Sequence, residues 1–161
     1  MAQQTEECKC FVVVRVRGTV RALKEARETL DLLRLSHTNH AILIDSRPAY
    51  KGMLQRVNNY VTWGEPTKET VAAMLQKRGR YLGDKKLAEN IEKTGYKSID
   101  ELADAIVNCK VAYKNLPDIE ARFKLHPPSK GYKGLTKKSF RAGGEAGYRG
   151  EAINDLVKRM V

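Results

Sequence analysis

Three short apolar runs stand out in the first 66 residues of this 161-residue chain. Residues 10–16 are mostly β-branched and are followed by Gly18, a pattern that predicts a β-strand ending before the glycine. Two further apolar runs, residues 41–44 and 60–63, predict a second and a third strand. All three runs are far too short to span a bilayer.

Two amphipathic stretches separate these predicted strands. Over residues 21–33 apolar side chains recur every three or four positions, which predicts a helix that buries Leu23, Ala26, Leu30 and Leu33. Pro48 favours the start of a second helix, because the first turn does not need its missing N–H. We therefore expect an α+β fold in which residues 1–66 form a two-layer β-α-β-α-β core. The pattern leaves parallel and antiparallel strand pairing both open.

The rest of the chain is expected to add two segments to this core. Residues 67–110 contain three helical patterns, which begin near Thr67, Asp84 and Ser98, and we expect them to form a helical extension packed beside the sheet. Residues 111–161 are expected to form a basic extension. Its terminal amphipathic helix would bury Ile153, Leu156, Val157 and Met160.

The net charge of +11 is concentrated near the carboxyl end. Residues 111–161 hold 11 basic and 5 acidic residues, which is more than half of the excess. Between Arg122 and Arg141 there are seven basic side chains and no acidic one, and prolines and glycines prevent a continuous helix. This basic strip has too little apolar content for a core of its own. A row of nucleic-acid phosphates is the first candidate for the polyanion that it would bind.

Two smaller basic clusters each allow a second interpretation. Arg15 and Arg17 should project from one face of the first strand, either on an open platform, under the helical extension or on an ordinary solvated face. Lys77, Arg78 and Arg80 end a predicted helix, where cations also stabilise the helix dipole without any ligand. Both clusters are therefore candidate RNA contacts with a structural alternative.

Patterns for catalysis, metal binding and targeting are missing from the sequence. Cys8, Cys10 and Cys109 have neither a disulfide-framework spacing nor a zinc-site spacing, so we expect a reducing compartment and no metal. The glycine- and lysine-rich stretch would need glycine at Thr136 to match a phosphate-binding loop. Residues 1–9 are polar and unlike a signal peptide. We expect no enzyme activity, no cofactor, no small-molecule substrate and no membrane contact.

The order and spacing of many positions resemble one family of ribosomal proteins. In the predicted core these positions are Thr29, Leu30, Leu33, Leu35, His37, His40, Ile42, Met53, Leu54, Val57, Tyr60 and Val61. Further similar stretches are residues 32–35, 60–66, 77–79, 123–125 and 143–147. Together they resemble the large-ribosomal-subunit protein L-thirty family, called L-seven in eukaryotes, in its long archaeal form.

The resemblance implies a three-stranded antiparallel sheet with two helices on one face. It also implies a structural, non-enzymatic protein of the cytoplasmic large ribosomal subunit. Such a protein would bind large-subunit rRNA, contact 5S rRNA and lie against neighbouring ribosomal proteins. The basic strip would order on binding. Glycines in and after it would allow close approach to the RNA backbone; they are Gly131, Gly134, Gly143, Gly144, Gly147 and Gly150. A basic adaptor that binds an acidic protein is the alternative function.

These arguments select candidate RNA-binding residues along the whole chain. The cations would contact phosphates, and Tyr132, Phe140 and Tyr148 would stack on unpaired bases. The candidates are Arg15, Arg17, Arg34, Arg47, Lys51, Arg56, Lys77, Arg78, Arg80, Arg122, Lys124, Lys130, Tyr132, Lys133, Lys137, Lys138, Phe140, Arg141 and Arg149.

Overall fold

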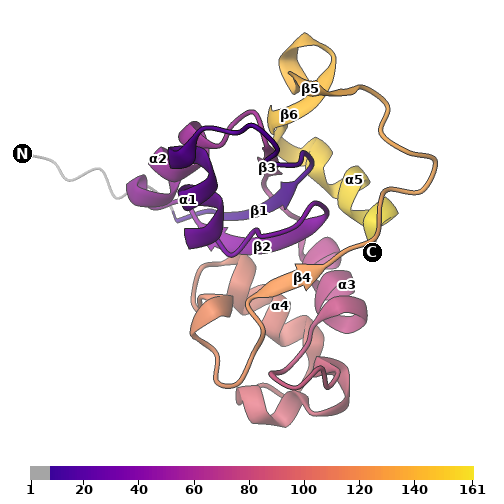
Figure 1. Ribbon diagram of the computed structural model, residues 1–161. Coiled ribbons are helices and arrows are strands. Elements are labelled where there is room, and N and C mark those ends of the chain that lie inside the picture. The colour runs from indigo at the N-terminus through magenta and orange to yellow at the C-terminus, as the bar shows by residue number, and fades with distance from the viewer. Residues whose placement is uncertain (1–7) are drawn as a thin grey trace, which may run out of the picture.

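The computed structural model describes residues 8–161 and contains one six-stranded sheet with helices on both faces (Figure 1). The strand order is β4-β2-β1-β3-β6-β5. The expected mixture of helices and strands is confirmed, whereas the expected number of three strands is wrong. Residues 1–7 lie outside the described residues. They are the first part of the expected core segment, residues 1–66, and of the polar stretch, residues 1–9.

The three predicted strands form the middle of the sheet. β1 (Cys10–Arg15) pairs in antiparallel fashion with both β2 (His40–Asp45) and β3 (Val61–Gly64). Val12 lies opposite Leu43 on one side and opposite Gly64 on the other. The antiparallel pairing implied by the family resemblance is therefore confirmed for these three strands.

The two predicted helices cover one face of the central strands. α1 (Lys24–Leu32) and α2 (Pro48–Arg56) lie together above the sheet in Figure 1, and Pro48 occupies the first turn of its helix. Their apolar side chains pack in one cluster against the strand residues that point toward these two helices. Its buried members are Phe11, Val13, Leu30, Leu33, Leu35, Ile42, Ile44, Leu54, Val57 and Val61.

The opposite face of the sheet is covered by helices from later in the chain. They are α3 (Lys68–Arg78), α4 (Ile99–Val107) and α5 (Ile153–Met160). Because successive strand residues point to opposite faces, Val12 and Val14 join this second apolar cluster while Val13 belongs to the first. The sheet is consequently buried on both sides in its middle.

Side-chain caps begin two of these helices where the sequence predicted them. The hydroxyl oxygen of Thr67 accepts from the N–H of Thr70, and that of Ser98 accepts from the N–H of Glu101 at 3.2 Å. The helix expected near Asp84 does not form. Asp84 has a φ of +62° and lies in a turn, so helical geometry cannot begin there.

Short 3-10 turns replace longer helices at several points of the chain. Two of them follow the turn at Asp84, one lies between α4 and β4, one lies between β5 and β6, and one precedes α5. They are η1 (Leu87–Glu89), η2 (Ile91–Thr94), η3 (Tyr113–Asn115), η4 (Phe140–Ala142) and η5 (Gly150–Ala152).

The strands that the sequence analysis missed come from the basic third of the chain. β4 (Arg122–Lys124) pairs in antiparallel fashion with β2, and β6 (Gly144–Tyr148) pairs in parallel fashion with β3. β5 (Leu135–Ser139) then pairs with β6. The central three strands leave open edges whose N–H and C=O groups need partners, and these segments supply them. The strip is therefore partly built into the sheet.

The described residues contain no long apolar helix. Among residues 8–161, no helix combines the length and the hydropathy that crossing a bilayer requires. Cys8, Cys10 and Cys109 are free thiols. In the same part of the chain no group of three or more His, Cys, Asp or Glu side chains is placed to hold a metal ion.

Phe123 should be a large contributor to the stability of the fold. Its side chain is 0% exposed and its ring stacks on Tyr113 with centroids 4.9 Å apart. Phe123→Ala should lower the free energy of unfolding by about 3–5 kcal/mol, since it leaves a cavity between β4 and α3. Denaturant unfolding measures this change. Val20→Ala, at a position 91% exposed, is the control and should change stability by less than about 0.5 kcal/mol.

His40 should make the stability of the protein depend on pH. Burial, with the charges of Arg122, His37 and Lys124, lowers the pKa of His40 from 6.5 to about 4. Between these values the folded state binds fewer protons than the unfolded state, so stability is full above about pH 6.5 and falls toward pH 4. Unfolding free energies measured across this window should show the slope, and His40→Gln should reduce it. An equal slope in both proteins would contradict the assignment.

Candidate nucleic-acid interface

The most exposed basic surface lies on the segment that links β4 to β6. We call residues 126–143 the basic excursion; it includes η4 and β5, the outermost strand of the sheet, which lies at the top of Figure 1. Its cations are Lys130, Lys133, Lys137, Lys138 and Arg141, and all five are exposed. Within residues 8–161 none of the five forms an ion pair with a carboxylate. Their charge is therefore available to a ligand.

A buried ion pair holds the base of the excursion. Glu145 Oε2 lies 2.6 Å from Arg149 Nη2, and both side chains are almost fully buried. The same nitrogen of Arg149 donates to the carbonyl of Glu145 at 2.7 Å, and Nε donates to Thr62 Oγ1 at 2.8 Å. The other carboxylate oxygen accepts from the N–H of Gly134 at 2.8 Å. One polar cluster thus joins β3, β6 and the start of β5.

Glycines let the strands of the excursion approach one another closely. A Cβ added to Gly144 would lie 2.1 Å from the backbone oxygen of Lys138, and one added to Gly134 would lie 2.5 Å from that of Gly143. These two glycines accommodate the protein's own backbone. Both glycines were expected to allow the RNA backbone to approach, whereas here the close neighbour of each is the protein's own backbone.

The loop before β5 is tied to the end of α5. The N–H of His126 donates to the carbonyl of Met160 at 2.9 Å, and Arg159 Nη1 donates to the carbonyl of Gly131 at 2.9 Å. Tyr132 is half-buried, and its hydroxyl donates to Asn39 Oδ1 at 3.1 Å. All of these partners belong to the protein itself. That the strip orders only on RNA stays a prediction, which limited proteolysis of the free protein can decide.

Arg15 and Arg149 are internal in this structure. Arg15 Nη1 donates to the carbonyls of Leu35 and Ser36 at 2.7 and 2.6 Å, and burial lowers its pKa. Its side chain lies on the face covered by α1 and α2, which corrects the expectation of an open platform. Because their guanidinium groups are already bonded within the protein, neither arginine belongs to the exposed surface.

Several other candidates share their charge with protein groups. Glu120 lies 2.7 Å from Arg122 Nε and 3.5 Å from Lys124 Nζ. Burial raises the pKa of Glu120, but the hydrogen bond from Arg122 and the nearby cations outweigh it and lower the value. Arg47 pairs with Asp45 at 2.6 Å, and Arg80 Nε lies 3.9 Å from Asp84. These cations are partly neutralised before any ligand arrives.

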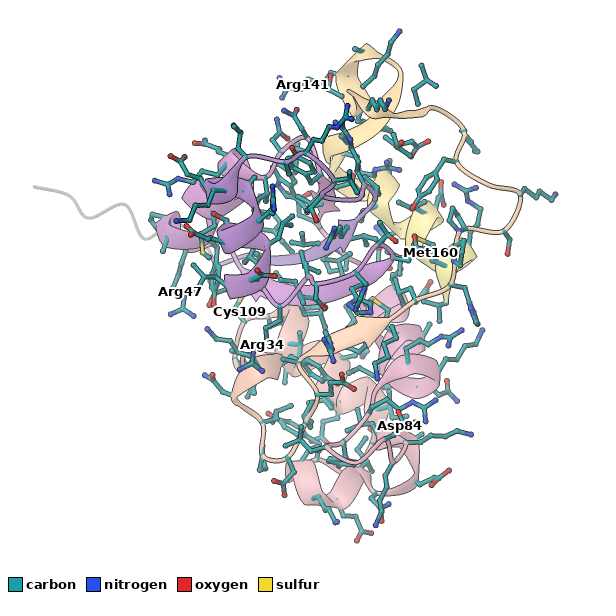
Figure 2. The ribbon with its side chains drawn as sticks, viewed as in Figure 1. Arg34, Arg47, Asp84, Cys109, Arg141 and Met160 are labelled. Atoms are coloured by element: carbon teal, nitrogen blue, oxygen red, sulfur yellow. The ribbon has the colours of Figure 1, made fainter. Side chains whose placement is uncertain are left out.

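The remaining candidates are scattered over the body of the protein. Arg34, Arg56 and Lys77 are exposed, whereas Arg17, Lys51 and Arg78 are half-buried. Arg17 lies over the ring of Tyr60, with its guanidinium carbon 5.5 Å from the ring centroid. Figure 2 shows Arg34 beside the body and Arg141 by the projecting excursion. Among the candidates, the five cations of the excursion are therefore the largest exposed group within one continuous segment.

The polar anchors of the excursion were missed by the sequence analysis. Glu145 and Thr62 hold Arg149, and Glu65 accepts from the hydroxyl of Tyr148 at 2.9 Å. The spacing of four residues between Glu145 and Arg149 was a possible signal. The glycines around it conceal that signal, because they make the segment look like a loop.

A model of one protein family matches the chain over residues 11–61, and its description is Ribosomal protein L30p/L7e. Curated relatives extend the similarity over nearly all of the chain. Each is named large ribosomal subunit protein uL30. The protein of Methanobrevibacter smithii is 44% identical over 94% of this chain and 99% of its own length.

Two further archaeal relatives agree with the first. The protein of Archaeoglobus fulgidus is 46% identical over 93% of this chain and 99% of its own length. That of Thermofilum pendens is 43% identical over 94% of this chain and 98% of its own length. These similarities confirm the family and the archaeal type that the sequence indicated. The chain therefore belongs to the L30p/L7e family of ribosomal proteins, structural and non-enzymatic constituents of the large ribosomal subunit.

Proposed function

We propose that this ribosomal protein binds and stabilises large-subunit rRNA, with the basic excursion as its main contact surface. The observation that carries the proposal is the set of five exposed cations, without carboxylate partners among the described residues, in one continuous segment, the excursion. Lys and Arg side chains that neutralise phosphates release condensed counterions, which drives association with RNA. The buried Glu145–Arg149 pair supports the proposal, because it joins the base of the excursion to β3 and β6 of the sheet.

The rest of the molecule would contribute to RNA binding in a graded way. The exposed cations Arg34, Arg56 and Lys77 are secondary contacts in this proposal. Arg122 and Lys124 contribute less, since Glu120 already neutralises part of their charge. We keep the proposed division of the chain into residues 1–66 and 67–110 as the body and 111–161 as the RNA-binding extension.

The family resemblance also supports a finer proposal about partners. We propose that 5S rRNA is among the RNAs contacted and that neighbouring ribosomal proteins pack against the body. Reconstitution of the large subunit with and without 5S rRNA tests the first point. Reduced incorporation of the protein when 5S rRNA is omitted is expected, and unchanged incorporation would remove 5S rRNA from the proposal.

Removing charge from the excursion should weaken rRNA binding. The test variant replaces four lysines together by alanine, at Lys130, Lys133, Lys137 and Lys138. In this variant log K for rRNA binding should depend less steeply on log salt concentration. The slope should change by about 0.7–0.9 for each lysine that contacts a phosphate. Binding of the purified protein to large-subunit rRNA at several salt concentrations measures this slope.

The matched control replaces four lysines elsewhere on the protein. Lys85, Lys86, Lys93 and Lys97 lie near the turns η1 and η2, at the end of the molecule away from the excursion (Figure 1). Their replacement removes the same charge, yet the slope should change much less. Equal slopes for the two quadruple variants would overturn the role of the excursion.

The conformation of the excursion should matter as well as its charge. Gly144→Ala would bring a Cβ to 2.1 Å from the backbone oxygen of Lys138, so β5 and β6 must separate. We expect weaker rRNA binding and a loss of about 1–3 kcal/mol in unfolding free energy, with the net charge unchanged. Gly18→Ala is the control, because an added Cβ there meets nothing within 4 Å. Unaltered rRNA affinity in a destabilised Gly144→Ala protein would contradict the expectation.

Sedimentation distinguishes RNA binding from the adaptor function. A protein held by rRNA should sediment with the large subunit and be released after ribonuclease treatment. An adaptor held by an acidic protein should stay with its partner after the same treatment. Retention that is insensitive to ribonuclease would therefore favour the adaptor.

A further inference from the structure

Phe140 is a large apolar side chain in an unusual place. It lies in η4, at the turn between β5 and β6, and its side chain is 37% exposed. No described apolar cluster includes it. The protein therefore covers only part of this side chain, and the rest is accessible to a ligand.

One face of the Phe140 ring is occupied by a buried cation. The guanidinium carbon of Arg149 lies over the ring, 4.8 Å from its centroid. Arg149 is only 8% exposed and is held by Thr62 and Glu145, as described above. Arg149 therefore covers one face of the ring, while 37% of the Phe140 side chain remains exposed. A ring that is fixed in this way loses little further entropy when a ligand stacks on it.

The other aromatic side chains of this region are less suited to stacking. Tyr132 is half-buried and bonded to Asn39 through its hydroxyl. Tyr148 is 41% exposed, but its hydroxyl donates to the carboxylate of Glu65. The centroid of its ring lies 6.3 Å from the ring centroid of Trp63. The negative charge of Glu65 beside Tyr148 repels RNA phosphates.

We infer that the open face of Phe140 is a stacking site for one unpaired base of the bound RNA, an inference that rests on the function proposed above. Every base has a π-face that can lie on an aromatic ring, and the cation behind the ring adds to the attraction. Arg141 follows Phe140 directly and Lys138 precedes it by two residues, and both are exposed. Their charges hold the phosphates on either side of the stacked base. An RNA ligand therefore fits this site better than an apolar protein segment does.

The affinity of Phe140 variants for purified large-subunit rRNA tests the inference. Phe140→Leu keeps an apolar side chain against Arg149 but removes the ring, and it should weaken binding about 5- to 150-fold. Phe140→Tyr keeps the ring and should retain the affinity. The salt slope should stay unchanged in both variants, because stacking of a neutral ring releases no counterions. Equal affinities for the Leu variant and the unsubstituted protein would overturn the inference.

Fluorescence separates base stacking from the effects of charge. Phe140→Trp adds a second tryptophan to the single Trp63, and a stacked base should quench the added emission. Polyphosphate carries the charge of RNA without bases and should leave that emission unquenched. Absent quenching by rRNA, or equal quenching by both ligands, would overturn the inference.

The remaining outcomes separate this inference from the proposed function. If the unsubstituted protein does not bind rRNA, the proposed function itself fails. If Phe140→Leu binds purified rRNA normally but is lost from assembled subunits, a protein neighbour covers the ring and the base-stacking inference is overturned.

Discussion

The buried ion pair between Glu145 and Arg149 determines how the third segment of the chain joins the sheet. Two ions cannot be taken out of water at low cost, so such a pair persists only where its remaining donors and acceptors are bonded. Here Thr62, the N–H of Gly134 and the carbonyl of Glu145 complete the bonding. The partners come from β3, β6 and the start of β5, and their geometry fits one register. The pair thus selects a unique arrangement of these strands more than it adds net stability.

That arrangement also explains the division of roles among the basic residues. Cations close to the sheet have partners within the protein: Arg15 donates to backbone carbonyls, and Arg122 and Arg149 pair with Glu120 and Glu145. Cations on the projecting excursion have no such partners among the described residues. Net positive charge is consequently exposed on the element that extends farthest from the body in Figure 1.

The central strands and their two helices were predictable because their patterns are long enough to be specific. Residues 10–16 supply a continuous β-branched run, and Leu30 and Leu33 mark a buried helical face. β4 was missed because its three residues, Arg122–Lys124, are too few to show a regular alternation of apolar and polar positions. β5 was missed because the strand is almost wholly exposed, and β6 because two of its five residues are glycine. In each case pairing with an existing edge, rather than local propensity, decides the conformation.

The candidate site was predictable in its charge and less so in its geometry. Composition predicted that Arg122 to Arg141 form a polyanion-binding strip, but no pattern distinguishes a paired arginine such as Arg15 from a free one. Strand alternation fixes the side of the sheet to which a residue points, and it does not reveal what covers that side. For the same reason the sequence does not distinguish Tyr132, Phe140 and Tyr148 as candidates for base stacking. Their different neighbours in the structure do distinguish them.

β5 is the outermost strand of the sheet, and its open edge has a consequence for the newly made protein. An unpaired edge can recruit a strand from another molecule and start aggregation. Lys137 and Lys138 lie in the middle of β5, where the register with β6 is irregular. Like charges repel a second copy, and the irregularity denies it a regular ladder. The same lysines therefore disfavour edge-to-edge pairing between two copies of the protein.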